Sequence, residues 1–515
     1  MGTTADKLNY LSNTKNLIKN AIVNKGQTVN SGDSFRSFAS KIESIQTGVN
    51  LNDYYDLTTN VTSFQQLVKK FPENIKLGTS AQDFFYGWNK VRPFPNIPNW
   101  DTSKVVNMSR MFFNCYWLNS TNLPNWNTSK VNNMCLMFEG CSSALNTIPN
   151  WDTSNVKDMR WMFANCWNLN FIPNLNTSNV IYMGNMFYYC NTLTSIPDLN
   201  TSNVKDMSNM FADCFKLTSI SNLNTINVTS MSHMFDFCGN LTSIPNFNTS
   251  NVIYMNYMFN SCSRLTSVPN FNTINVTNIV NAFSGCYNLT SIPNFDLSNV
   301  TNTSNMFGSC RNLTSIPNFN TIKATDMRYM YSSCSNLKEI SNLKIFGSNI
   351  NISGMFHQSG LERIFNVTFE NMFYGPLAAF TNTNLTNISN ISFINVNGYG
   401  FFTNCFNLIS ATNINILGIK DAAGQMFANC YNLVNVSISG STNLQYLSGM
   451  FRACNNLSDA SIQNIINMLL NSTNIYSAYK NLRNTYSQSP FYETNIANTR
   501  YQNRWSELTA AGWTY

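Results

Sequence analysis

A period of 24 residues constrains this chain more than any other feature of its sequence. Residues 177–200 read TSNVIYMGNMFYYCNTLTSIPDLN, and residues 201–224 read TSNVKDMSNMFADCFKLTSISNLN. The same length continues unit by unit to residue 344. Cysteines mark the register at intervals of 24 residues: Cys166, Cys190, Cys214, Cys238, Cys262, Cys286, Cys310 and Cys334. A fixed period of this length is typical of a solenoid, in which each unit packs only against its neighbours.

Each unit combines apolar residues at helical spacing with a strand-like segment. The apolar residues of one unit lie at offsets 0, 3, 6, 7 and 10: Val180, Met183, Met186, Phe187 and Cys190. These offsets place them on one face of a short helix, and Thr177 and Ser178 just before it are favoured N-cap residues. The LTSIP segment after the cysteine favours a short strand closed by proline. The sequence therefore predicts an α/β repeat solenoid, with a short helix and a short strand in each turn.

The repeat pattern changes towards both ends and divides the chain into four parts. Residues 1–49 contain two amphipathic helical patterns joined by a turn, and we expect a helical attachment module too small to be stable alone. It would dock on a partner or self-associate into a homo-oligomer. Residues 50–87, with large residues at irregular spacing, are predicted to cap the solenoid. Residues 88–457 hold about 16 turns, and residues 458–515 are predicted to form the C-terminal cap.

The cysteines form a column. Of the 14 cysteines, 13 occupy the same repeat position, and Cys135 is out of register. Equivalent Cβ atoms in stacked turns are expected about as far apart as stacked strands, ~4.8 Å, whereas a disulfide needs ~3.8 Å. We therefore expect buried free thiols that act as small hydrophobic side chains. Neither a CxxC motif nor paired histidines accompany them, which argues against a metal site.

Composition argues against two kinds of partner. Charged residues are 11% of the chain, against about 25% in ordinary proteins. The net charge is +7, and the basic residues are scattered through the units. A nucleic-acid-binding protein would gather its basic residues on one face. No apolar run approaches the ~20 residues of a membrane helix, and MGTTADKLNY lacks the apolar core of a signal peptide. We expect a chain made in the cytoplasm, with no nucleic-acid partner and no membrane insertion.

Two stretches resemble known families. NWDTSKVVNMSRMFFNC, NWDTSNVKDMRWMFANC and LTSIP, which recur over residues 95–457, resemble the BspA-like repeats of bacterial surface proteins, a divergent branch of leucine-rich repeats. The ordinary consensus L-x-x-L-x-L-x-x-N is absent. TADKLNYL, NTKNLIKNAI and FRSFASKIESI, all within residues 1–49, resemble the N-terminal segment of phage tail, fibre and other virion proteins. The second resemblance implies attachment to another virion protein.

The sequence contains no recognisable catalytic constellation. Its only histidines, His233 and His357, lie about five turns apart. Asp158 and Asp206 recur in one column two turns apart, or ~9.6 Å, near the upper limit for an inverting glycosidase pair. A lysine precedes each of them, so we interpret this column as a solvated face. We expect no enzymatic activity, no cofactor and no metal.

Positions that vary between units are the ones that face solvent, and in the early units they are unusually aromatic. These aromatic residues are Phe113, Tyr116, Trp117, Trp161, Trp167, Tyr182, Tyr188, Tyr189, Tyr254 and Tyr257. Exposed aromatic patches commonly mark binding surfaces, and flat rings beside Asn and Ser side chains suit glycans. The alternative is that each ring packs over the next turn and only seals the stack.

Three functions remain open from the sequence. The first is a non-enzymatic phage virion protein, such as a tail fibre, in which residues 1–49 dock on the particle and the solenoid binds a glycan or protein of the bacterial surface or host mucosa. The second is a bacterial cell-surface BspA-like adhesin. The third is a polysaccharide-degrading tail enzyme.

Overall fold

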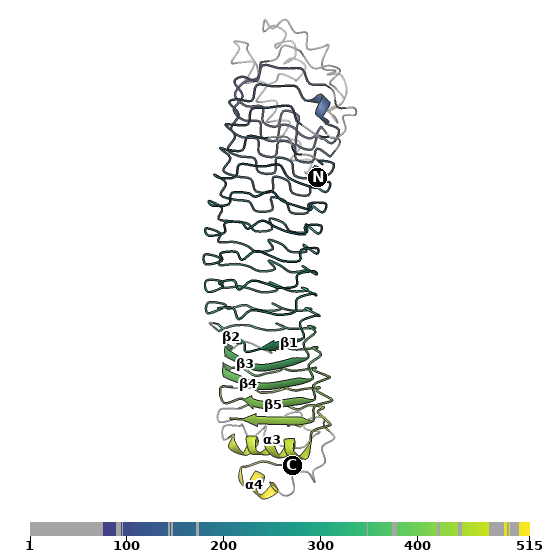
Figure 1. The fold of residues 1–515 in the computed structure, drawn as a ribbon, viewed down its shortest axis with the longest axis vertical. Coiled ribbons are helices and arrows are strands. Elements are labelled where there is room, and N and C mark those ends of the chain that lie inside the picture. Colours follow the sequence, from purple (N-terminus) through teal and green to yellow (C-terminus); the bar gives the residue numbers. More distant parts are fainter. Residues whose placement is uncertain are drawn as a thin grey trace, which may run out of the picture.

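The computed structural model describes residues 76–472 with short gaps, together with residues 489–491, 494 and 504–514. The gaps are residues 89–93, 95, 143–144, 146–147, 171, 173–174, 348, 373–377, 420–422 and 441–444. The described residues form one long stack of coils, with one repeat in each coil (Figure 1). The predicted helical module, 1–49, and most of the predicted cap, 50–87, lie outside the described residues.

The apolar half of each repeat is a run of tight turns, not a helix. The N–H of Phe187 donates to the carbonyl oxygen of Met210 in the next coil at 3.0 Å, whereas the N–H of Met186 donates to Met183 at 3.1 Å. Tyr189 has a φ of +59°, which a right-handed helix excludes. The helix prediction was therefore wrong. Alternate N–H groups bond to the neighbouring coil, and a left-handed residue every fourth position keeps the segment flat.

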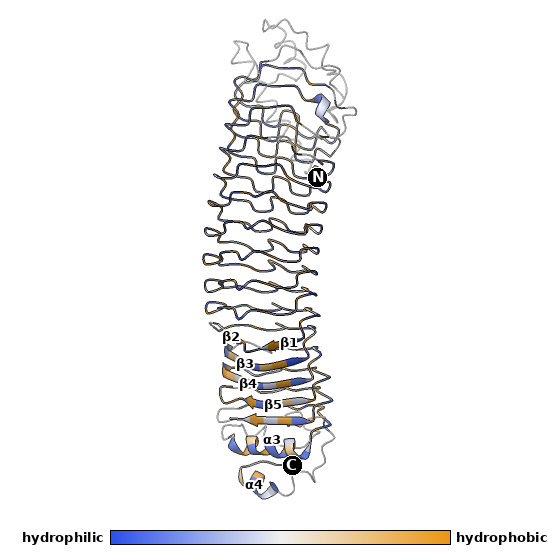
Figure 2. Cartoon of the chain, in the orientation of Figure 1, coloured by the Kyte–Doolittle hydropathy of each residue, from blue (hydrophilic) through white to orange (hydrophobic). Residues whose placement is uncertain are grey.

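The strand prediction is correct only near the C-terminal end, where six strands form one parallel sheet. The strands are β1 (Glu339–Ser341), β2 (Lys344–Phe346), β3 (Arg363–Met372), β4 (Asn387–Val396), β5 (Ser410–Asn415) and β6 (Asn435–Ser439). Their order is β1-β3-β4-β5-β6, and β2 also pairs with β3. Ile364 of β3 lies beside Ile388 of β4, one coil further. Hydrophilic and hydrophobic residues alternate along these strands (Figure 2).

Proline prevents the same segment from forming strands in most of the earlier described coils. Pro197 and Pro245 have no N–H to donate to the neighbouring coil, so a continuous ladder cannot form there. Ser221 replaces proline in one unit, but it lies between these two prolines and also stays outside any strand. At the equivalent position of β1 the residue is Ser341, and the strands begin with that coil.

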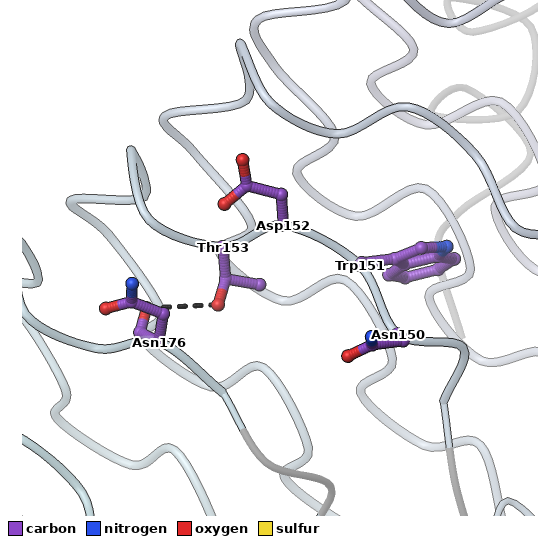
Figure 3. A pocket seen from close by; sticks show the side chains of 5 residues that line it. All are labelled: Asn150, Trp151, Asp152, Thr153 and Asn176. Atoms are coloured by element: carbon purple, nitrogen blue, oxygen red, sulfur yellow. Dashed lines mark hydrogen bonds between the residues drawn. The ribbon is translucent and has the colours of Figure 1, made fainter.

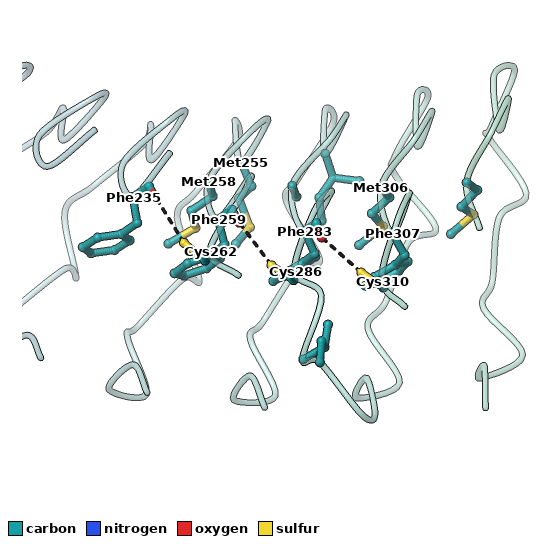
Figure 4. Packing of buried hydrophobic residues seen from close by; sticks show 14 of the residues in the cluster. Phe235, Met255, Met258, Phe259, Cys262, Phe283, Cys286, Met306, Phe307 and Cys310 are labelled. Atoms are coloured by element: carbon teal, nitrogen blue, oxygen red, sulfur yellow. Dashed lines mark hydrogen bonds between the residues drawn. The ribbon is translucent and has the colours of Figure 1, made fainter. Parts of the chain in front are cut away.

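The core consists of columns of equivalent side chains, and the phenylalanine column is the longest. Successive rings from Phe85 to Phe451 stack with centroids 4.9 to 5.7 Å apart and nearly parallel planes, and Tyr331 replaces phenylalanine once. Figure 4 shows part of this column with its methionine and cysteine neighbours. Offset stacking of this kind adds about 0.5–1.5 kcal/mol to each pair beyond the burial of its apolar area.

The cysteine column is buried and free, and it does more than fill space. All 14 cysteines are free thiols, and the 13 in register are buried. The Cys190 thiol donates to the carbonyl oxygen of Phe163 in the preceding coil at 3.1 Å, and the other cysteines of the column make the equivalent bond. Burial raises the pKa of Cys214 and Cys286 to about 12. The thiols therefore join adjacent coils through hydrogen bonds.

Threonine and asparagine side chains also join adjacent coils. Thr177, predicted to cap a helix, is buried and donates from Oγ1 to the carbonyl oxygen of Asn200 at 2.9 Å. Asn179 donates from Nδ2 to the carbonyl oxygen of Ser154 in the preceding coil at 2.7 Å. The same amide bond recurs at Asn203, Asn227, Asn251, Asn275 and Asn299. Some of the many Asn and Thr residues therefore have a structural role, because their side chains bond adjacent coils together.

Three helices are described. A short 3-10 helix, η3 (Ser120–Asn122), lies in an early coil, and α3 (Asp459–Asn471) packs beside β6 at the C-terminal end. Ser458 caps α3 by accepting a hydrogen bond from the N–H of Ser461 at 3.2 Å. α4 is Trp505–Ala510. Within the described part of the chain, none of the helices is long and apolar enough to cross a membrane.

Phe235→Ala should lower the free energy of unfolding by about 3–5 kcal/mol, because it leaves a cavity in the buried ring column. Guanidinium unfolding followed by circular dichroism measures the change. Phe237→Ala is the control, since Phe237 is 46% exposed, and its effect should stay within about 0.5 kcal/mol. Equal effects of the two substitutions would show that the ring column does not stabilise the stack.

In the native protein, only Cys135 should react with a thiol reagent, because it is half-buried while the other cysteines are buried. Burial, followed by the charge of Asp158, raises the pKa of Cys135 to about 11. The reactive thiolate forms as pH rises towards that value, so the labelling rate should increase about tenfold per pH unit from 7 to 10. Mass spectrometry locates the label, and Cys135→Ser should abolish it. Native labelling of a column cysteine would contradict the prediction.

Candidate ligand-binding surface

All ten aromatic residues predicted to bind ligand lie among the described residues, in or just after the turn-rich half of the repeat. Five are exposed: Tyr116, Trp117, Trp167, Tyr182 and Tyr254. Five are half-buried: Phe113, Trp161, Tyr188, Tyr189 and Tyr257. Side chains at these positions leave the core columns untouched, so they can vary without disturbing the stack.

The structure brings four of these residues together with Phe215. Tyr188 contacts Trp161 with ring centroids 5.7 Å apart, and it contacts Tyr189 at 6.1 Å. Tyr189 in turn meets Trp167 at 6.4 Å and Phe215 at 6.1 Å, both edge-to-face. These five residues, which we name the aromatic cluster, span three adjacent coils. Trp167 and Phe215 are its most exposed members, at 45% and 41%.

Several of the other predicted residues pack in separate places. Phe113 stacks on Tyr86 of the preceding coil, with centroids 4.8 Å apart. The Arg160 guanidinium lies over the Tyr182 ring at 5.2 Å. Tyr257 stacks on His233 at 4.5 Å. These rings fit the interpretation that an aromatic side chain covers its neighbouring turn.

The remaining three are placed by their backbone register. Tyr254 belongs to a column of isolated bridges, between Ser230 and Asn278. Tyr116 and Trp117 follow Cys115, two coils before the coil that carries Trp161. The ten residues therefore do not form a single patch.

The backbone holds several surface rings in the left-handed region. Trp161, Tyr189, Phe237 and Tyr257 have φ values of +58°, +59°, +56° and +57°. Asparagine occupies one of these positions in a neighbouring coil at Asn185, where φ is +61°. This conformation costs about 1–2 kcal/mol for residues with a Cβ, and asparagine tolerates it better than a bulky ring. The same two register positions are also left-handed in other described coils, as at Leu136, Ser261 and Ala453, so the conformation belongs to the coil and does not by itself mark a binding site.

A carboxylate lies next to the aromatic cluster. Asp213 occupies the same register position as Tyr189 and Phe237 and lies one coil from each. Burial and the nearby charge of Asp236 raise the pKa of Asp213, and a hydrogen bond from the Tyr188 hydroxyl partly opposes them. The same surroundings raise the pKa of Tyr188, through burial and then the charge of Asp213.

A second carboxylate, Asp236, has its oxygens occupied. Its Oδ2 lies 2.8 Å from His233 Nδ1, and its Oδ1 accepts a hydrogen bond from Asn260 Nδ2 at 2.8 Å. The Asp236 side chain is 12% exposed. The backbone carbonyl of Asp236 also accepts the N–H of Asp213 at 2.7 Å, so the two acids lie on adjacent coils. Asp236 thus has protein partners for both carboxylate oxygens.

Asp158 and Asp206 are the two carboxylates of the glycosidase interpretation. Each accepts a hydrogen bond that closes a turn of the coil. Asp158 Oδ1 accepts the N–H of Arg160 at 3.0 Å, and Asp206 Oδ1 accepts the N–H of Ser208 at 2.9 Å. Arg160 also forms an ion pair with Asp158 at 2.6 Å. Tyr182 lies between the two acids in the bridge column. Their arrangement is that of a repeated turn, and it favours the structural interpretation of this column.

A depression of about 500 Å³ lies on the Asn-rich turn of the repeat and is lined by Asn150, Trp151, Asp152, Thr153 and Asn176 (Figure 3). Thr153 Oγ1 donates to the carbonyl oxygen of Asn176 at 3.0 Å. Asp152 Oδ1 accepts the N–H of Ser154 at 2.9 Å. Because these groups bond within the stack, the depression is a weaker candidate than the aromatic cluster. Across the described coils, no group of three or more His, Cys, Asp and Glu side chains is arranged to hold a metal ion.

Two sequence families match the repeats. The family described as "Mycoplasma protein of unknown function, DUF285" matches residues 79–196, 167–268, 190–291 and 263–367. These matches together cover more than half of the chain. The chain belongs to the DUF285 family. Residues 376–482 match the family described as "BspA type Leucine rich repeat region (6 copies)". The resemblance to BspA-like repeats is thereby confirmed for the C-terminal coils, whereas no match supports a likeness of residues 1–49 to virion proteins.

Solved structures similar to this chain include bacterial leucine-rich repeat proteins. A leucine-rich repeat protein from Bacteroides ovatus ATCC 8483 is 17% identical with a TM-score of 0.34, over 70% of this chain and 85% of that one. A leucine rich cell surface protein from Faecalibacterium prausnitzii A2-165 is 16% identical with a TM-score of 0.24, over 60% and 85%. At these TM-scores the likeness carries no inference about function. No curated protein matches the chain.

Sequence analysis missed four residues of this surface: Phe215, Phe237, Asp213 and Asp236. Phe215 and Phe237 are exposed rings in the same register as predicted residues, so aligning the units position by position would have found them. Asp213 and Asp236 gave no such signal, because single acids at variable positions look like ordinary surface charge. Only the stacking of coils places Asp213 beside Tyr188.

Phe237→Asn should raise the free energy of unfolding by about 0.5–1 kcal/mol, because asparagine tolerates the left-handed backbone better than phenylalanine. Thermal unfolding followed by circular dichroism measures the shift. Phe215→Asn is the matched control, since Phe215 is similarly exposed but follows Cys214, outside the left-handed positions. Stabilisation by both substitutions, or by neither, would show that backbone strain at Phe237 is not relieved by asparagine.

Proposed function

We propose that this protein is a non-enzymatic bacterial cell-surface adhesin whose solenoid presents the aromatic cluster to a glycan. The observation that carries the proposal is the group of five contacting rings on adjacent coils, of which Trp167 and Phe215 are exposed. Rings at these positions add nothing to the buried columns. Binding is the function that best accounts for keeping them there.

The stack suits this role because it is rigid. Each coil is bonded to the next through backbone N–H groups, thiols and amides, so the rings are held at fixed separations. A preorganised surface of this kind loses little conformational freedom on binding. Exposed faces of Trp167 and Phe215 can accept the C–H faces of a sugar ring, and neighbouring Asn side chains can bond its hydroxyl groups.

The match of residues 376–482 to BspA-type repeats supports a place on the cell surface. The virion hypothesis depends on residues 1–49, which lie outside the described residues, and no sequence match supports it. A bacterial adhesin is therefore the better-supported setting for the same binding surface.

Glycan-array binding of the full chain should reveal bacterial or mucosal glycans that lose most of their signal with Trp167→Ala or Trp161→Ala. Stacking of a nucleic-acid base on an aromatic ring is worth about 1–3 kcal/mol, and we expect loss of a stacked sugar contact to be of similar size. Phe406→Ala is the matched control: Phe406 is 43% exposed and occupies the Trp167 register position far along the stack. It should leave binding unchanged.

Unchanged binding by both tryptophan variants would overturn the assignment to the aromatic cluster. Detection of the chain in purified phage particles, and not on intact bacteria, would return the virion hypothesis to first place.

A further inference from the structure

Asp213 lies in a setting that an ordinary surface carboxylate does not have. Rings flank it along its own register column, at Tyr189 one coil before and Phe237 one coil after. Phe215 is two residues further along the same coil, and the small, buried Ala212 directly precedes Asp213. Burial and the charge of Asp236 raise the pKa of Asp213, and a hydrogen bond from Tyr188 partly opposes them. The acid therefore lies among aromatic side chains, where water solvates it less well.

No cation of the described residues forms an ion pair with Asp213. Lys216, three residues further on, is exposed and forms no ion pair with an acid among the described residues. His233, in the next coil, already pairs with Asp236. Asp236 adds a second negative charge on the adjacent coil and disfavours ionisation of Asp213. A partly desolvated carboxylate without a counter-ion is unfavourable, and a bound cation would compensate it. In a chain of net charge +7, this acidic spot is a local exception.

We propose that the aromatic cluster and Asp213 together bind a glycan that carries a protonated amine, such as a glucosamine unit without its N-acetyl group. The sugar ring stacks on an exposed ring of the cluster, and its ammonium group pairs with the Asp213 carboxylate. This inference rests on the proposed function and specifies its ligand. Aromatic rings around the carboxylate add attraction for the ammonium group through their π faces.

The two halves of the site favour an amino sugar over a peptide cation. A lysine side chain would satisfy Asp213, but it would leave the exposed faces of Trp167 and Phe215 without an apolar partner. A neutral sugar would cover the rings and leave Asp213 without a counter-ion. An amine-bearing pyranose supplies both partners within one residue, which fits rings and carboxylate on adjacent coils.

Calorimetric titration of the full chain tests the proposal with two oligomers that share a β-1,4 skeleton, one of glucosamine and one of N-acetylglucosamine. The glucosamine oligomer should bind at least about tenfold more tightly at pH 6, where the amine is charged and can form a charge-assisted hydrogen bond with the carboxylate. Its affinity should fall with added salt, as expected of a partly exposed ion pair.

Asp213→Asn should weaken binding of the glucosamine oligomer about tenfold and leave the weaker N-acetylated oligomer nearly unchanged. Asparagine tolerates this left-handed position, as Asn165 shows at the equivalent position two coils earlier, so the variant should fold. Asp198→Asn is the matched control, because it removes the charge of an exposed acid on the Asn-rich turn. It should leave both affinities unchanged.

Equal binding of the two oligomers, or an unaltered affinity in Asp213→Asn, would overturn the amine proposal while leaving glycan adhesion intact. Tighter binding of an oligolysine peptide than of the glucosamine oligomer would assign the carboxylate to a protein partner and would also overturn it. Absence of binding to any glycan on the array would instead remove the proposed function itself.

Discussion

The backbone hydrogen bond between adjacent coils is the constraint on which this structure depends. Alternate N–H groups of the turn-rich segment, such as that of Phe187, donate to the residue one coil further on. This ladder fixes the register, so that a residue type repeated every 24 positions becomes a column in space. The stacked phenylalanine rings, the thiols that donate to phenylalanine carbonyls, and the asparagine amides all follow from that register. One coil alone could bury none of them.

A fixed register also separates structure from recognition. Core positions must keep the size and shape of their column, whereas surface positions of the same segment touch only their neighbours. The left-handed positions lie on this free side, and they accept asparagine at Asn185 or a strained ring at Trp161 and Tyr189. Chemical variety is therefore confined to a strip along the solenoid. The aromatic cluster and Asp213 lie on that strip, where a change in ligand preference would leave the stack intact.

The outcome for individual elements shows which sequence patterns are informative. Apolar spacing correctly identified the buried residues of each unit, yet it predicted a helix where the chain forms turns. Offsets of 3, 4 and 7 fit both structures, and the difference lies in φ at residues such as Tyr189, which composition does not reveal. The strand prediction treated proline as the end of each strand and not as a break in the coil-to-coil ladder. It was correct only from β1 onwards, where Ser341 takes the place of proline.

By itself, the sequence determined that the chain is a solenoid, which residues form its buried columns, and that its cysteines stay unpaired, because these depend only on the repeat period and on residue type. The tertiary structure decided how each coil turns, which surface rings meet, and that Asp213 lies beside the Tyr188 hydroxyl. Those features depend on contacts between residues one coil apart. Their geometry is set by the left-handed turns and the coil-to-coil ladder, which no single repeat can show.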